Sequence, residues 1–98
     1  MRDGTAPPQS YEELRAAIAQ RFGRLSDRLQ RIARHALEHP DAIALDTVAA
    51  IAKQALVQPS SLIRFARAFG YDGFSDMQRV FRRHLLARSP DYGQRLRA

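Results

Sequence analysis

Residues 47–69 read TVAAIAKQALVQPSSLIRFARAF and contain two short amphipathic segments separated by a few residues. Thr47 can cap a first helix that ends at Gln54, because its hydroxyl can accept a hydrogen bond from an N–H group of the first turn. A second helix is expected over Pro59–Phe69, since proline is favoured at the first position of a helix. Two short helices at this spacing predict a helix-turn-helix.

The second of these helices has distinct apolar and polar faces. Its apolar stripe comprises Leu62, Phe65, Ala66 and Phe69. Successive helix residues turn by about 100°, so Ser60, Arg64 and Arg67 point away from this stripe. Residues 53–69 contain no acid, and such a face suits the major groove of DNA because arginine binds guanine through two hydrogen bonds. The alternative is that these arginines only solvate an exposed helix face.

The candidate DNA-binding residues come from both helices and from the turn between them. Ser60, Ser61 and Arg64 are expected to approach base edges or adjacent phosphates. Lys53 and Arg67 are expected to hold the DNA backbone, and the N-termini of both helices to direct N–H groups at phosphates. The complete candidate set is Thr47, Lys53, Gln58, Ser60, Ser61, Arg64 and Arg67.

Two helices are expected before this motif. Ser10 followed by Glu13 fits a capping box, in which each side chain bonds the backbone of the other residue. Ser26 can cap the second helix, which Pro40 ends. Residues 41–45 are then expected to form a short turn.

One further helix is expected after the motif. Gly70 supplies a stop, because glycine readily adopts the left-handed conformation found after many helices. Ser75 with Gln78 fits a second capping box, and the helix ends at Ser89-Pro90. No segment alternates as a strand does. The sequence therefore predicts an all-α fold, a single compact bundle of about five helices that contains a helix-turn-helix.

The length, the cysteine content and the charge of the chain limit the functions that the protein can have. The chain has 98 residues, no cysteine, and a formal net charge of +6. The length predicts one domain, and the absence of cysteine excludes disulfides and thiol nucleophiles. Fifteen of the 16 basic residues are arginine, which favours a nucleic-acid partner and then an anionic membrane surface. GC-rich coding would give the same bias, so both explanations stay open.

The positive charge is concentrated in the second half of the chain. Residues 1–52 are neutral overall, whereas residues 53–69 carry three basic and no acidic side chains. Residues 70–98 carry six basic and three acidic side chains. A basic amphipathic last helix leaves binding to a lipid surface as one alternative.

No residue pattern indicates catalysis or a cofactor. His35 and His39 lie one helical turn apart, but a stable metal site needs three or four ligands, so we expect surface histidines and no metal. Neither a Ser/His/Asp constellation nor a glycine-rich phosphate loop is present. The sequence therefore predicts a protein that is not an enzyme.

Domain boundaries and location follow from the ends of the chain. Residues 1–9 are expected to be a flexible tail, residues 10–88 the folded domain, and residues 89–98 the start of a linker or a C-terminal tail. No signal sequence and no apolar stretch of about 18 residues occurs, so we expect a cytoplasmic protein without membrane contact.

The run from Val57 to Ser75 resembles the N-terminal DNA-binding domain of the RpiR/MurR transcriptional regulators. The resemblance rests mainly on Arg64-Phe65 and on Gly70-Tyr71-Asp72-Gly73-Phe74, and it extends over about residues 11–86. It implies a domain that binds an operator and regulates sugar or sugar-phosphate metabolism. It also implies a sugar-phosphate effector that acts through a C-terminal domain absent from these 98 residues. We therefore expect the chain to be part of a longer regulator, and a natural short form is the alternative.

The sequence departs from this family at three positions in or near the turn. Leu56 stands where the family usually has glycine, and a residue with a side chain is strained there if φ is positive. Gln58 replaces the usual serine cap, and Ser61 replaces the usual threonine but keeps the hydroxyl group.

The leading hypothesis is sequence-specific binding to double-stranded DNA by a homodimer, since one module of this size would bind weakly. Leu86 and Leu96 are candidates for an exposed dimer surface. The alternative is a helix-turn-helix module for protein interaction or dimerisation without DNA binding.

Overall fold

Three helices begin directly after a serine or threonine whose hydroxyl accepts a hydrogen bond from an N–H group of the first turn. The caps are Ser10 for α1 (Tyr11–Arg21), Ser26 for α2 (Asp27–Glu38) and Thr47 for α4 (Val48–Ala55). These hydroxyls satisfy N–H groups that have no partner inside the helix. The three predicted caps are confirmed.

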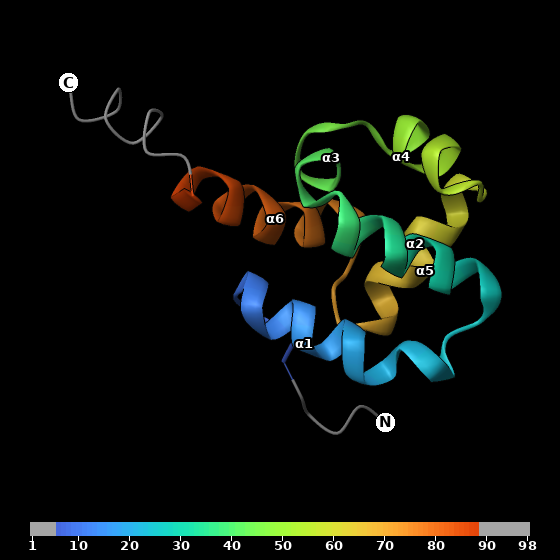
Figure 1. Cartoon of the computed structure of the whole chain (residues 1–98), viewed down its shortest axis with the longest axis horizontal. Coiled ribbons are helices and arrows are strands. Elements are labelled where there is room, and N and C mark those ends of the chain that lie inside the picture. Colours follow the sequence, from blue (N-terminus) through green and yellow to red (C-terminus); the bar gives the residue numbers. More distant parts are fainter. Residues whose placement is uncertain (1–5, 89–98) are drawn as a thin grey trace.

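The computed structural model describes residues 6–88, and within this range the chain is helical with no strand (Figure 1). The remaining elements are the 3₁₀ helix η1 (Phe22–Arg24), α3 (Pro40–Leu45), α5 (Pro59–Ala68) and α6 (Phe74–Arg88). The predicted all-α class is confirmed. The expected helix Pro59–Phe69 is one residue shorter, because Phe69 is its C-cap.

Helix α3 is the main difference from the expected order of elements, because a turn was predicted over residues 41–45. This helix buries Ile43 and Ala44, and it is held at its C-terminal end by two side chains of α6. Gln78 Nε2 donates to the carbonyl oxygens of Ile43 (3.2 Å) and Asp46 (3.0 Å), and Arg82 Nε donates to that of Ala44 (3.0 Å). A helix this short depends on tertiary contacts, so residues 6–88 form six α-helices where about five were expected.

The two predicted capping boxes are not both formed. Helix α6 begins at Phe74, before Ser75, and Gln78 is buried against α3, so the second box is wrong. At α1 the serine half is confirmed, but Glu13 Oε1 accepts a hydrogen bond from the backbone N–H of Gln9 (3.1 Å).

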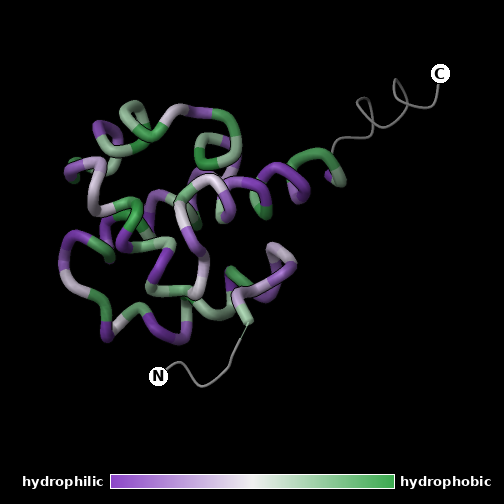
Figure 2. Tube along the Cα trace, turned by 180° about the vertical axis from the view of Figure 1, so that it is seen from behind, coloured by the Kyte–Doolittle hydropathy of each residue, from purple (hydrophilic) through white to green (hydrophobic). Residues whose placement is uncertain are grey.

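All six α-helices of residues 6–88 contribute buried side chains to one core. Helix α6 packs against α3, α5 and α1, and α2 packs against α3, α4 and α5. Figure 2 shows hydrophobic and hydrophilic positions alternating along the helices, as expected when each helix buries one face. The largest fully buried side chains are Leu14, Ile18, Ile32, Ile43, Ile51, Leu62, Phe65, Met77 and Phe81.

Pro7 and Pro8, which the sequence assigns to a flexible tail, contact the turn between α5 and α6. The Tyr71 hydroxyl donates to the carbonyl oxygen of Pro8 (2.8 Å). Gly70 has φ +96°, and a Cβ atom there would lie 3.3 Å from Pro7 Cα, so both the conformation and the close contact favour glycine. Residues 1–5 of the predicted tail and the predicted linker over residues 89–98 lie outside the described residues.

Replacing Gln78 by leucine is expected to lower the free energy of unfolding by about 1–3 kcal/mol, because two carbonyl groups lose their buried donor. Urea unfolding measures the effect, and Gln20→Leu, at an exposed position of α1, is the matched control. Equal stability of the two variants would contradict the role of Gln78.

Tyr71 makes the stability of the domain sensitive to alkaline pH. Burial raises the pKa of Tyr71 from 10.0 to about 12, with Glu13 adding to the rise and Arg83 opposing it. The neutral phenol is thus favoured by folding. Its contribution to stability is present below pH 10 and is lost as the pH rises towards 12.

The corresponding measurement is urea unfolding at pH 8 and at several values between pH 10 and 12 for the wild type and Tyr71→Phe. The free energy of unfolding is expected to fall more steeply for the wild type over the alkaline range. Parallel curves for the two proteins would show that Tyr71 does not cause the loss.

Candidate nucleic-acid interface

Helices α4 and α5 are joined by residues 56–58 and form the predicted helix-turn-helix (Figure 1). The N–H group of Val57 bonds the carbonyl oxygen of Ala52 (2.9 Å), and that of Leu56 bonds the carbonyl oxygen of Lys53 (3.2 Å). This pattern closes the C-terminus of α4 and reverses the chain direction. Pro59 occupies the first turn of α5, as expected.

Leu56 adopts the left-handed conformation, with φ 62° and ψ 46°. Within residues 6–88 it is the only residue other than glycine with positive φ, and its side chain is 75% exposed. The strain expected for a residue with a side chain in place of glycine is therefore present. Arg31 of α2 donates from Nη1 to the Leu56 carbonyl oxygen (3.1 Å), which ties the turn to the body of the domain.

The two faces of α5 are largely as the sequence predicts. The buried residues of this helix are Ser61, Leu62, Phe65 and Ala66. Ser60, Arg64 and Arg67 are exposed on the other side, and Ile63 lies beside them with 41% of its surface exposed.

Ser61 does not lie on the outer face where contact with base edges was expected. Only 5% of its surface is exposed, and it lies beside the first turn of α2. The packing of α2 against α5 covers this side of the helix, which the pattern of α5 alone does not show. Direct contact of Ser61 with a base edge is therefore not supported.

The remaining candidates occupy different positions around α5. Lys53 is exposed in the last turn of α4, and the Thr47 hydroxyl is used to cap that helix. Gln58 is exposed and makes no side-chain capping bond, so its side chain does not cover the N-terminus of α5. Arg67 Nε donates to the carbonyl oxygen of Asp72 (3.2 Å), so this arginine also holds the turn after α5.

Two arginines that support this motif were not identified from the sequence. Arg31 holds the turn, and Arg21 of α1 donates from Nη1 to the carbonyl oxygen of Ala68 (2.9 Å) at the C-terminus of α5. The Arg21 guanidinium also lies 4.8 Å from the centre of the Phe69 ring. No local sequence signal distinguishes these arginines from solvated ones, because their partners are 25 and 47 residues away.

A chain of hydrogen bonds fixes α4 relative to α2. His35 Nε2 lies 2.8 Å from Gln54 Oε1, and Gln54 Nε2 donates to Asp46 Oδ2 (2.9 Å). Asp46 directly precedes the Thr47 cap, so this chain connects α2 with both ends of α4. His35 is thus engaged in positioning the motif.

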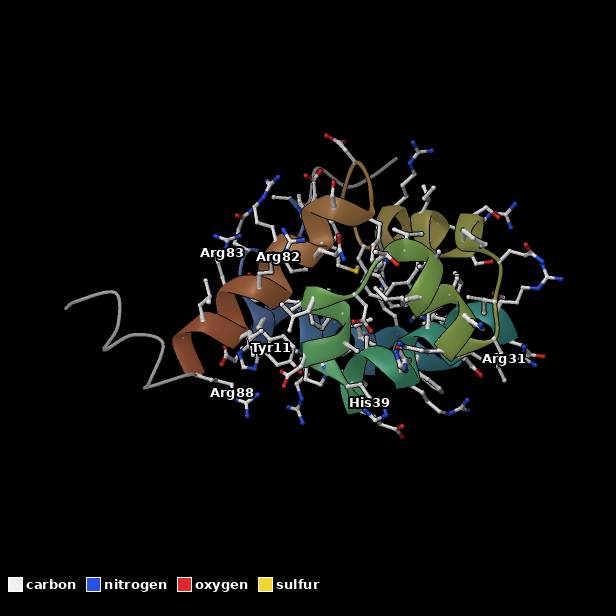
Figure 3. All side chains as sticks on the ribbon, turned by 90° about the horizontal axis from the view of Figure 1, so that it is seen from above. Tyr11, Arg31, His39, Arg82, Arg83 and Arg88 are labelled. Carbon is white, nitrogen blue, oxygen red and sulfur yellow. The ribbon has the colours of Figure 1, made fainter. Side chains whose placement is uncertain are left out.

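The other basic residues lie elsewhere on the molecule. Figure 3 shows Arg82, Arg83 and Arg88 of α6 at the end of the molecule opposite Arg31. Of the four apolar residues of α6 that left a lipid surface open, Val80 and Phe81 are buried in the core, Leu85 is partly buried and Leu86 is 44% exposed. Among residues 6–88, the basic side chains of the second half of the chain therefore lie both on the α4–α5 motif and on α6.

Other kinds of site find no support within residues 6–88. This range holds no group of three or more His, Cys, Asp or Glu residues that could bind a metal ion. In the same range, no helix combines the length and the apolar character needed to cross a bilayer.

A comparison of the sequence with protein-family models finds a match that covers most of the chain. The model described as the helix-turn-helix domain of the rpiR family matches residues 11–87, which include every α-helix except the last residue of α6. No curated protein and no solved structure matches the chain.

Replacing Leu56 by glycine is expected to raise the free energy of unfolding by about 1 kcal/mol. Glycine removes the left-handed backbone strain of about 1–2 kcal/mol. Part of this stabilisation is offset, because glycine has more conformational entropy than leucine in the unfolded chain. Leu45→Gly is the control, since Leu45 is similarly exposed but helical and its replacement is expected to cost stability. Thermal unfolding of both variants measures the difference, and a loss of stability for Leu56→Gly would contradict the strain.

Proposed function

The chain belongs to the rpiR family of helix-turn-helix domains, and we propose that it binds double-stranded DNA sequence-specifically with α5 in the major groove. The observation that carries this proposal is the outer face of α5. This face presents Ser60 and Arg64 next to a helix N-terminus that its N-cap side chain does not cover. Hydroxyl groups and arginine are donors to phosphates and guanine edges, and the start of α5 adds the Ser60 N–H, because Pro59 has no N–H and the Ser61 N–H bonds the Gln58 carbonyl oxygen (2.9 Å).

We assign base recognition to the N-terminal half of α5. Arg64 is exposed and can reach the O6 and N7 atoms of guanine through two hydrogen bonds. Ser60 is exposed one turn earlier and suits a base edge or a phosphate. Gln58, at the start of the helix, completes this group.

We assign contacts with the DNA backbone to Lys53, Arg67 and the N-terminus of α4 at Thr47. Lys53 is exposed on the helix that precedes the turn. Arg67 uses its Nε–H group to bond the Asp72 carbonyl oxygen, and its other guanidinium N–H groups are available to a phosphate. These contacts neutralise phosphates and fix the register of α5, but they do not distinguish sequences.

We propose that two copies bind a two-fold-related operator. A single module contacts too little DNA for tight binding, and two-fold symmetry doubles the contact area. Leu86, near the C-terminal end of α6, is 44% exposed and suits a dimer contact, while Leu96 lies outside the described residues. The family further supports a regulator of sugar or sugar-phosphate metabolism, whose effector would act through a separate domain outside these 98 residues.

The first test is selection of bound sequences from a random duplex library, followed by affinity measurements over a range of salt concentrations. Release of counterions predicts that log K falls with log salt by about 0.9 for each phosphate contacted. A flat salt dependence would favour a protein-interaction module. The large apolar side chains exposed to such a partner within residues 6–88 are Leu45, Leu56, Ile63 and Leu86.

Replacing Arg64 by alanine is expected to weaken binding to the selected duplex by about 1–3 kcal/mol and to relax the preference at one base position. Replacing Lys53 by alanine is expected to weaken binding to selected and random duplexes equally. Competition binding with both duplexes measures the two effects. Unchanged preference in Arg64→Ala would overturn the assignment of Arg64 to base recognition.

A further inference from the structure

A shallow hollow of about 400 Å³ lies between the first turn of α2 and α5. Its lining residues are Ser26, Asp27, Arg28, Leu29, Ser61 and Arg64. Arg64 also belongs to the outer face of α5, so the hollow borders the proposed DNA-binding surface. None of the assignments made above uses Arg28.

The Ser61 hydroxyl is available to a ligand in this hollow. The residue is 95% buried, yet its hydroxyl takes part in none of the side-chain hydrogen bonds within residues 6–88. Buried hydroxyl groups are normally paired. No fully buried side-chain oxygen or nitrogen of the described residues lacks a partner, so the Ser61 oxygen retains access to the hollow.

The start of α2 adds further donors on the same side. The Ser26 hydroxyl accepts from the Leu29 N–H (3.3 Å) and the Ser26 carbonyl oxygen from the Gln30 N–H (2.8 Å). The Ser26 hydroxyl engages the N–H group of Leu29, the third residue of α2. The N–H groups of the first two residues, Asp27 and Arg28, have no carbonyl partner inside the helix. The N-terminus of a 12-residue helix also carries a partial positive charge.

The structure assigns this hollow as the binding site of one DNA backbone phosphate, beside the base pairs that α5 contacts. This assignment rests on the proposed function. Arg28, the Ser61 hydroxyl and the first N–H groups of α2 donate to the phosphate oxygens, and Arg64 lies between the phosphate and the bases. The Asp27 carboxylate opposes the phosphate charge. Its presence leaves the three ionised side chains of the hollow with a net charge of +1.

Two charge changes at the hollow have opposite expected effects. Arg28→Ala is expected to weaken binding to the selected duplex about tenfold, as for the loss of one charge-assisted hydrogen bond, and to reduce the salt slope by about 0.9. Asp27→Asn is expected to strengthen binding several-fold by removing a like charge. Neither variant is expected to change base preference, because a phosphate contact carries no sequence information.

Matched controls make the same charge changes on α1, away from the hollow. They are Arg15→Ala for Arg28→Ala and Glu12→Gln for Asp27→Asn, and all four variants are checked for unchanged thermal unfolding. Ser61→Ala is expected to leave the free energy of unfolding unchanged, because its hydroxyl has no partner to lose, and to weaken DNA binding by a few-fold without changing the salt slope.

The outcomes separate this inference from the proposed function. Absence of salt-dependent DNA binding by the wild type would overturn both. A second outcome is that the wild type binds DNA while each hollow variant has the same affinity and salt slope as its control, Arg28→Ala as Arg15→Ala and Asp27→Asn as Glu12→Gln. That result would overturn only the phosphate-binding site. Inorganic phosphate alone is expected to give no saturable rise in the unfolding temperature, and such a rise, lost in Arg28→Ala, would assign the hollow to a free anion.

Discussion

The carbonyl groups at the C-terminal ends of short helices are the constraint on which this structure depends. Each helix leaves up to four carbonyl groups without an internal partner, and a short helix leaves most of its backbone in that state. Arg21 satisfies a carbonyl of α5, Arg31 the turn after α4, and Gln78 and Arg82 the end of α3. Gln30 of α2 donates to the Phe22 carbonyl oxygen (2.9 Å) at the C-cap of α1, where the Leu25 N–H also bonds. Long polar side chains from neighbouring helices therefore set the relative positions of the elements.

The net charge of +6 therefore does not come only from residues that are free to bind a partner. Several arginines that contribute to the basic composition serve as donors to backbone carbonyl groups, and Arg31 and Arg82 do so at opposite ends of the molecule (Figure 3). They keep their positive charge and so still attract polyanions, but their positions are fixed by the fold. Within residues 6–88, Arg64 donates to no backbone carbonyl group, and its side chain is exposed on the surface of the motif. Net charge alone therefore indicates the kind of partner and not the surface that binds it.

The candidate interface was predictable to the extent that it depends on one helix. The period of α5 separates Ser60 and Arg64 from the buried Phe65 without knowledge of any other element. The position of Ser61 could not be predicted, because the residue is covered by α2, a helix that the pattern of α5 does not include. Contacts between helices far apart in the sequence have no local pattern.

The sequence by itself determined the all-α class, three helix caps, the helix-turn-helix and the inner face of α5. These features follow from local hydrogen bonding and from hydrophobic spacing, which act over one or two helical turns. The tertiary structure alone decided that residues 40–45 form a helix, that Gln78 is buried against it, and that Ser61 faces α2. These outcomes depend on partners tens of residues away, because backbone groups and polar side chains in the interior take whichever donors the packing brings to them.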